Sequence, residues 1–425
     1  PEMRATTLQI VWHGKQPVFS LDFHRSGALA TAGGDKDVRL WSVAVGPDGE
    51  PEVEFRSNFS MHHSTVNVVR FSPAGEAMAT GGDQGELLVW QPSAADGAGS
   101  RQKYFQAWKV SSALRGHLND INDVSWSSDS TALVSGSIDS CAIVWSAEKG
   151  KGEARLDGHS HYVQGVALDP LGEYVISQSG DRTCRVYSHR PPAAGRKKAQ
   201  ARGVAGKAKD FVCHNVMGRL TRFLRGKDGE ARQERTFLFG DENMATFFRR
   251  LAWAPDGSFV VVPAGVDASP GRGNTAHVFA RGQWSRPVFS LPSLSRPVIA
   301  ARFCPAFFKA SAAPSEGSPF QLPYKLVYAV ASLDAVLVYT TESTKPVAMA
   351  SGLHYAPITD LAWSWDARTL AISSHDGYCS LLTFGEGELG EIVGADALPE
   401  PARSLVLARD GLLREKEERV QERAP

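Results

Sequence analysis

Four kinds of residue recur along the first half of this chain at fixed spacing. A histidine is followed by a hydroxyl residue 18 positions later, by an acidic residue 22 positions later and by an aromatic residue 28 positions later. The sets are His13, Thr31, Asp35 and Trp41; His62, Thr80, Gln84 and Trp90, with Asp83 one position early; His117, Ser135, Asp139 and Trp145; and His159, Ser177, Asp181 and Tyr187. A period of this kind indicates a repeat architecture.

Each repeat unit has the pattern of a small antiparallel sheet. In the third set, strand-like runs at Asn122–Trp126, Ala132–Ser135 and Ala142–Trp145 are separated by clusters of Ser and Asp, which favour turns. We expect the histidine to lie in the loop entering the sheet and to meet the acidic residue of the next turn. The hydroxyl and aromatic residues then complete a buried polar network, which must satisfy its own hydrogen bonds.

This pattern resembles the WD40 repeat, whose Gly-His and Trp-Asp pairs mark the same positions. Gly116 precedes His117 as the repeat requires, whereas Trp145 is followed by Ser146 rather than by Asp. The resemblance implies an all-β, seven-bladed WD40 β-propeller over residues 6–390. Seven first strands are predicted, at Val18–Phe23, Asn67–Phe71, Asn122–Trp126, Gln164–Leu168, Phe248–Trp253, Ile299–Phe303 and Thr359–Trp363.

A ring of blades must be closed by pairing its two ends. Thr7–His13 alternates in polarity like a strand and precedes the first blade. We predict that it forms the outer strand of the seventh blade; a loose N-terminal arm is the alternative.

A basic loop insertion is predicted at residues 190–239, between blades 4 and 5. Residues 190–235 hold 13 Lys and Arg and 4 Asp and Glu. A solvated loop, a nuclear import signal and a contact with an acidic partner or with phosphates all fit this composition. The candidate binding residues are Arg196, Lys197, Lys198, Arg219, Arg222 and Arg225.

Two further segments stand apart from the repeats. Phe247, Phe248, Arg249 and Arg250 open the fifth blade. Either Phe248 packs in the blade and the arginines line the channel or its rim, or Arg249 and Arg250 pair with a partner's carboxylates, with Phe247 beside them. Residues 391–425 form a short charged tail, which we expect to be helical or disordered and to lie outside the propeller.

Catalytic and metal-binding patterns are scarce. A His–Ser–Asp set that recurs in blade after blade indicates structure, because an enzyme needs its catalytic site only once. The sequence contains no GxSxG, phosphate-binding loop, HExxH or CxxC motif, and its five cysteines are widely spaced. We therefore expect no enzymatic activity, no cofactor and no metal. Zero net charge and the lack of an apolar run of 18 residues also argue against a membrane protein.

Specific strings extend the resemblance to one family. WHGKQPVFSLDFH, LRGHLNDINDVSW, TFFRRLAWAPDGS and LPYKLVYAVASLDAVLVY follow one another in order. They resemble the middle, WD40 subunit of chromatin assembly factor 1, and the likeness spans residues 6 to about 390. A related propeller occurs in the replication-independent histone regulator.

The resemblance implies a nuclear scaffold in a three-subunit histone chaperone. Its partners would be the large and small subunits and histones H3–H4, with anti-silencing factor 1 at the C-terminal tail. Direct contact with DNA stays open. The alternatives are the propeller of the replication-independent histone regulator and a generic WD40 adaptor, such as a ubiquitin-ligase substrate receptor.

Overall fold

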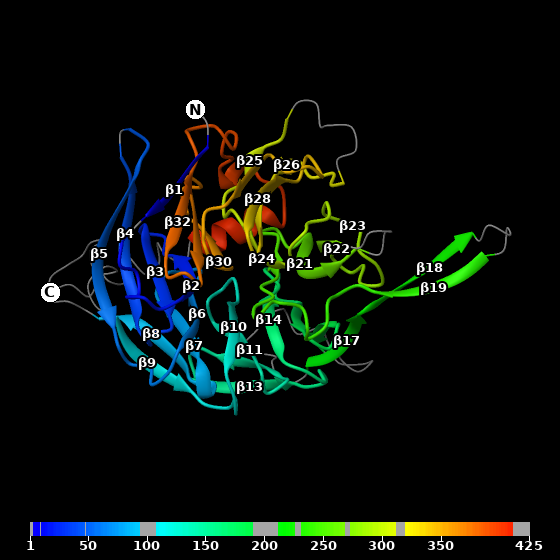
Figure 1. Cartoon of the computed structure of the whole chain (residues 1–425), viewed down its shortest axis with the longest axis horizontal. Coiled ribbons are helices and arrows are strands. Elements are labelled where there is room, and N and C mark those ends of the chain that lie inside the picture. Colours follow the sequence, from blue (N-terminus) through cyan, green and yellow to red (C-terminus); the bar gives the residue numbers. More distant parts are fainter. Residues whose placement is uncertain are drawn as a thin grey trace.

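The computed structural model describes residues 3–8, 10–46, 48–93, 108–189, 211–225, 231–267, 273–311 and 319–410. It forms a seven-bladed β-propeller in which every blade is a four-stranded antiparallel sheet (Figure 1). Blade 1 contains β2 (Val18–Phe23), β3 (Ala28–Gly33), β4 (Val38–Val45) and β5 (Pro51–Phe59). Blade 2 contains β6 (Val66–Phe71), β7 (Met78–Gly82), β8 (Leu87–Pro92) and β9 (Trp108–Leu114).

The next two blades keep the same plan. Blade 3 contains β10 (Ile121–Trp126), β11 (Ala132–Ser137), β12 (Ala142–Ser146) and β13 (Lys151–Leu156). Blade 4 contains β14 (Val163–Leu168), β15 (Tyr174–Ser179), β16 (Cys184–His189) and β17 (Phe211–Met217).

Blades 5 and 6 are less regular. Blade 5 contains β20 (Ala252–Trp253), β21 (Phe259–Val266), β22 (Asn274–Ala280) and β23 (Phe289–Ser290). Blade 6 contains β24 (Val298–Phe303), β27 (Val327–Ser332), β28 (Ala335–Thr340) and β29 (Ala348–Ser351). Two hairpins lie outside the blades: β18 (Arg219–Arg225) with β19 (Ala231–Phe237), and β25 (Phe308–Lys309) with β26 (Tyr324–Lys325).

The two ends of the chain close the ring in blade 7. This sheet contains β30 (Ile358–Trp363), β31 (Thr369–Ser374) and β32 (Cys379–Thr383), and β1 (Arg4–Leu8) pairs with β32 as the outer strand. The predicted closure is therefore confirmed, but the predicted range Thr7–His13 was wrong. Trp12 and His13 are buried in the loop that enters blade 1, so they cannot belong to the closing strand.

Burial falls from the inner to the outer strands. First and second strands such as β6 and β11 are buried along their whole length, because both faces pack against neighbouring blades. The outer strands β5 and β9 alternate between buried and exposed residues. Between blades 2 and 3, for example, Val68, Ile121 and Leu133 pack in one apolar cluster. The apolar core is thus divided into layers between successive blades.

The described part of the tail packs on the propeller. Residues 395–397 form a short 3₁₀ turn and residues 402–410 are helical. Leu398, Ala402 and Val406 join the apolar cluster of blades 5 and 6. The expectation of a tail outside the propeller was therefore wrong for residues up to 410. No helix among the described ranges has the length and apolar character needed to cross a membrane.

Candidate protein-interaction site

The predicted polar network of blade 3 is assembled in the structure. Nδ1 of His117 lies 2.9 Å from a carboxylate oxygen of Asp139, and Nε2 lies 2.7 Å from the Ser135 hydroxyl. The indole N–H of Trp145 donates to the same hydroxyl at 2.8 Å. Burial disfavours ionisation of Asp139, but hydrogen bonds from His117 and its neighbours outweigh this effect and lower the pKa of the carboxyl group. The four side chains therefore satisfy one another.

Blades 1 and 4 repeat this geometry. His13 lies 2.6 Å from Asp35 and 2.8 Å from Thr31, whose hydroxyl accepts from the Trp41 indole at 2.9 Å. In blade 4, His159 lies 2.9 Å from Asp181 and 2.8 Å from Ser177. Tyr187 instead donates its hydroxyl to the Asp157 carbonyl at 3.3 Å.

Blade 2 replaces the expected acidic residue. Nδ1 of His62 lies 3.1 Å from Glu86, while Nε2 lies 2.7 Å from Thr80, and the Trp90 indole donates to Thr80 at 2.8 Å. Neither Gln84 nor Asp83 takes this place; Asp83 accepts a hydrogen bond from Asn67 at 2.9 Å. The longer glutamate side chain reaches the histidine from two positions further along the turn.

Blade 7 holds a network that the sequence analysis missed. His354 lies 3.1 Å from Asp376, and the Ser380 hydroxyl lies 3.0 Å from its Nε2. The spacing of 22 residues between His354 and Asp376 was visible in the sequence. The hydroxyl, however, comes from the third strand rather than from the second, so the set was incomplete as a pattern.

These networks are buried rather than open to a substrate. Ser135 and Ser177 have no exposed surface. In blade 3, potential ligand atoms of His117, Asp139 and Cys141 lie within 4.8 Å of one another, a spacing that a metal ion could use. Burial raises the pKa of the Cys141 thiol, and Sγ donates to Asp139 at 2.9 Å. Thr183 makes the equivalent contact with Asp181 in blade 4, which indicates a hydrogen bond of the repeat.

Arg249 and Arg250 lie in the interior and not on a surface offered to a partner. Both have no exposed surface. Arg249 donates to the carbonyls of Ser179 and Gly240, at 3.1 and 2.7 Å. Burial lowers its pKa to about 10. The expectation that these arginines pair with a partner's carboxylates is therefore corrected, whereas Phe247 is 50% exposed.

Arg250 belongs to a buried cluster of charges shared among blades. Its guanidinium donates to Asp360 at 2.7 Å, and Arg70 contacts the same carboxylate at 2.8 Å. The Ser20 hydroxyl donates to Asp360 at 2.8 Å. Burial lowers the pKa of Arg250 despite the attraction of Asp360. This cluster joins blades 1, 2, 5 and 7 because their first strands, or the loop entering them, contribute its side chains.

The basic insertion is more ordered than predicted. Residues 211–217 form β17, the outer strand of blade 4, and residues 219–237 form the β18–β19 hairpin, which extends outward from the ring (Figure 1). The expectation of a single loop over 190–239 was wrong for this part. Arg219 is exposed at the base, and Arg222 and Arg225 lie within β18. Arg196, Lys197 and Lys198 fall outside the described residues.

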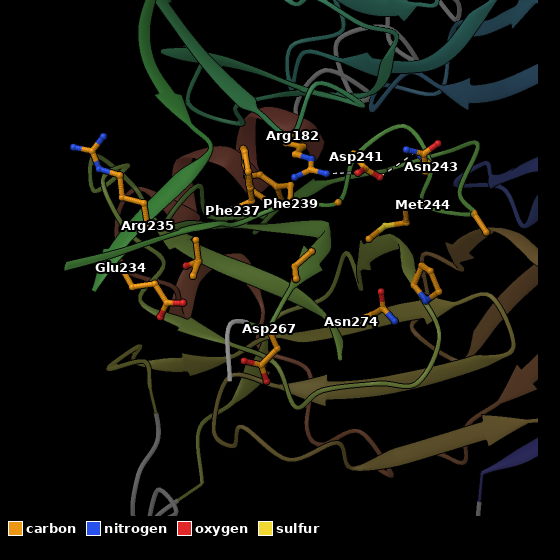
Figure 2. Close-up of a pocket in the computed structure, with 15 residues that line it drawn as sticks. Arg182, Glu234, Arg235, Phe237, Phe239, Asp241, Asn243, Met244, Asp267 and Asn274 are labelled. Carbon is orange, nitrogen blue, oxygen red and sulfur yellow. Dashed lines mark hydrogen bonds and ion pairs between the residues drawn. The ribbon is translucent and has the colours of Figure 1, made fainter. Parts of the chain in front are cut away.

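A cavity of about 500 Å³ lies at the base of the hairpin (Figure 2). Residues of β19, the loop entering blade 5 and the turn after β21 line it. Guanidinium carbons of Arg182 and Arg219 lie 4.4 and 4.6 Å from the ring centre of Phe237, which is 37% exposed. Arg182 also pairs with Asp241, and this hydrogen bond lowers the pKa of that carboxyl group. The cavity thus combines an aromatic surface with charges of both signs.

A second cavity, of about 250 Å³, lies under the tail helix. Its walls are mainly apolar, with Pro73, Trp126 and Trp365 facing Leu405 and Val406 of residues 402–410. Arg25 pairs with Asp410 at 2.7 Å, and its guanidinium carbon lies 4.8 Å from the Trp365 ring centre. Since Val406 is 8% exposed, the helix already covers much of this surface.

Comparison with known proteins places this propeller in a family. Residues 3–389 match the CAF1B/HIR1 beta-propeller domain. The chain is 44% identical over 392 residues to a chromatin assembly factor 1 subunit FAS2 homolog of Oryza sativa subsp. japonica, covering 91% of this chain and 74% of the relative. It belongs to the CAF1B family of chromatin assembly factor 1 subunits.

Relatives from distant organisms carry the name of the same factor. The CAF1B protein of chromatin assembly factor 1 from Gallus gallus is 41% identical, with 91% of this chain and 69% of the relative covered. Its counterpart from Saccharomyces cerevisiae is 34% identical, with 90% and 86% covered. Protein HIR1 of Eremothecium gossypii is 28% identical over 93% of this chain but only 48% of its own length. The chain therefore resembles CAF1B proteins more than HIR1.

Proposed function

We propose that this protein is a non-catalytic scaffold subunit of a chromatin assembly factor 1 complex in the nucleus. It binds the large subunit, works beside the small subunit and helps to deposit histones H3–H4 onto newly replicated DNA. The match to CAF1B relatives over about nine-tenths of the chain carries this proposal. A propeller offers loops and edges for binding, and its buried networks leave the hydroxyl groups of Ser135 and Ser177 without access to a substrate.

The distribution of charge supports two kinds of partner. Residues 190–235 carry 13 Lys and Arg and 4 Asp and Glu, so the rest of this neutral chain carries 33 Lys and Arg and 42 Asp and Glu. The acidic remainder suits basic histones, and the basic segment suits an acidic region of the large subunit. Contact with anti-silencing factor 1 through residues beyond 410 remains part of the proposal.

Co-purification at low and high salt tests the function directly. The full chain is mixed with the large subunit and with H3–H4, separately and together. We expect a stable complex with the large subunit that retains histones, and we expect the complex to weaken as salt screens the basic segment. A failure to bind the large subunit at either salt concentration would overturn the scaffold function.

A further inference from the structure

The hairpin of β18 and β19 leaves strand edges open to another chain. Among the described residues, these strands pair with each other and with no third strand. The edge of a sheet presents peptide N–H and C=O groups that can pair with an added strand. A two-stranded hairpin is also only marginally stable by itself, so a third strand would stabilise it.

The pairing register identifies which peptide groups face outward. Arg219 lies opposite Phe237, and the N–H of Leu238 donates to the Gly218 carbonyl at 2.9 Å. In an antiparallel pair, successive residues point alternately toward and away from the partner strand. The peptide groups of Phe237, Arg235 and Gln233 therefore point away from β18. They form a row of three on the outer edge of β19.

The cavity at the base of the hairpin favours β19 as the receiving strand. Four consecutive residues, Glu234–Phe237, line it, whereas no described residue of β18 does. Asp267 and Asn274 of blade 5 contribute to its walls (Figure 2). A strand added along β19 would thus have space beside it for side chains.

Charge indicates what kind of segment fits. Residues 211–237 carry six Lys and Arg and three Asp and Glu. Arg219 and Arg235 are exposed near the cavity. Nucleic acid would also be attracted to these cations, but it has no peptide groups to pair with a strand edge. Acidic protein in an extended conformation matches both the charge and the unpartnered edge.

We propose that β19 binds an extended acidic segment of a partner protein by strand addition, through the peptide groups of Gln233, Arg235 and Phe237. The inference rests on the proposed function for its partner, because it assigns the segment to the large subunit. It goes beyond that function by naming the receiving strand and the binding mode.

Three variants of the full chain separate backbone pairing from charge. Arg235→Pro removes both an outward N–H and the positive charge without deleting a β18–β19 hydrogen bond. Arg235→Ala removes the charge but keeps the N–H. Thr221→Pro places the same restraint at the outward position opposite Arg235, on β18. Affinity for the large subunit is measured for each variant, and thermal unfolding verifies that each propeller remains folded.

Strand addition predicts a clear order of effects. Arg235→Pro should weaken binding about ten-fold or more, Arg235→Ala about three-fold or less, and Thr221→Pro should bind like wild type. Equal losses for Arg235→Pro and Arg235→Ala, or competition by duplex DNA that both variants abolish, would show that only charge matters and would overturn strand addition. An equal loss with Thr221→Pro would assign the effect to the hairpin as a whole and would overturn the assignment to β19.

The wild-type control separates this inference from the proposed function. If wild type binds the large subunit and all three variants bind equally well, strand addition fails while the scaffold function stands. If wild type itself does not bind, the proposed function fails and the inference falls with it.

Discussion

Five blades and two blades of this propeller are held together by different chemistry. Blades 1, 2, 3, 4 and 7 each contain a histidine in the entering loop that contacts a carboxylate and a hydroxyl. The loops entering blades 5 and 6 contain no histidine, since none occurs between His214 and His277 or between His277 and His354. His277 lies within β22 instead, 2.8 Å from Ser290 and 2.7 Å from the Leu238 carbonyl.

The additions to the ring gather on the irregular side. The β18–β19 hairpin leads into blade 5, β25–β26 interrupts blade 6, and residues 402–410 pack on the apolar cluster of those two blades. In blade 6, the rings of Tyr328 and Tyr339 stack with their centres 5.5 Å apart. The regular blades thus form the frame, and blades 5 and 6 carry the elements that distinguish this chain from a generic propeller.

The largest expected effect concerns the buried charges beside blade 5. Arg250→Met leaves Asp360 buried with less compensation and should lower the free energy of unfolding by about 3–5 kcal/mol. Urea denaturation measures this change. Arg296→Met is the matched control, because the Arg296 side chain is 65% exposed and should contribute about 0.5 kcal/mol or less. A loss below about 1 kcal/mol for Arg250→Met would contradict the role given to the cluster.

A regular blade should also be sensitive, through its network. His117→Ala removes the partner of Asp139 and of the buried Ser135 hydroxyl, and should cost about 2–4 kcal/mol in the same measurement. His63→Ala is the control, because that side chain is 85% exposed. Binding of the large subunit by folded His117→Ala protein should equal wild type. If binding is lost while the fold is kept, the regular blades are not only a frame.

The tail helix should detach when its buried face becomes charged. Val406→Asp should cost about 1.5–3 kcal/mol of docking free energy, because Val406 is buried against blades 5 and 6. Limited proteolysis should then cleave near residues 399–410 more rapidly. Leu407→Asp, at a position that is 45% exposed on the same helix, should retain wild-type cleavage.

Stability should decrease as pH falls below about 6.5. Burial lowers the pKa values of His62 and His354 in the folded state, so the unfolded chain takes up protons first. Each histidine contributes at most about 1.4 kcal/mol per pH unit. Burial raises the pKa of Asp22 to about 6, and its protonation in the folded state opposes this trend. Urea denaturation at pH 7.5, 6.5 and 5.5 measures the slope, which His354→Gln should reduce and Asp22→Asn should steepen.

A second loss of stability is expected in stronger acid. The pKa values of Asp35, Asp139 and Asp181 are lowered because hydrogen bonds and charge from their histidines outweigh burial. The stability that these carboxylates contribute is present above about pH 4 and is lost as pH falls toward their folded pKa values. A stability curve that stays flat below pH 4 would contradict this account of the networks.

The sequence predicted the regular blades well because strand pattern and network spacing agree there. Six of the seven first strands were placed within one residue. The exception, Phe248–Trp253, is longer than β20 because the N–H groups of Arg249 and Arg250 donate to Gln164 and Ile299 of the flanking blades. That pairing depends on neighbours distant in sequence, so a local pattern could not reveal it.

The candidate site was harder to predict than the fold. The high charge of residues 211–237 suggested a solvated loop, although exposed strands tolerate charged residues equally well. The fully buried Arg249 and Arg250 look like surface residues in sequence, because their carbonyl and carboxylate partners come from other blades. The docking of the tail depends on a few apolar residues, such as Leu398 and Val406, within a charged segment.

Hydrogen–deuterium exchange of the full chain, with and without the large subunit, tests the central claim that the regular blades frame a scaffold whose irregular side binds. We expect the complex to slow exchange at residues 211–240 and in blade 5, while the entering loops of blades 1 to 3 exchange as before. Protection confined to those entering loops, with none in the β18–β19 hairpin, would contradict the account.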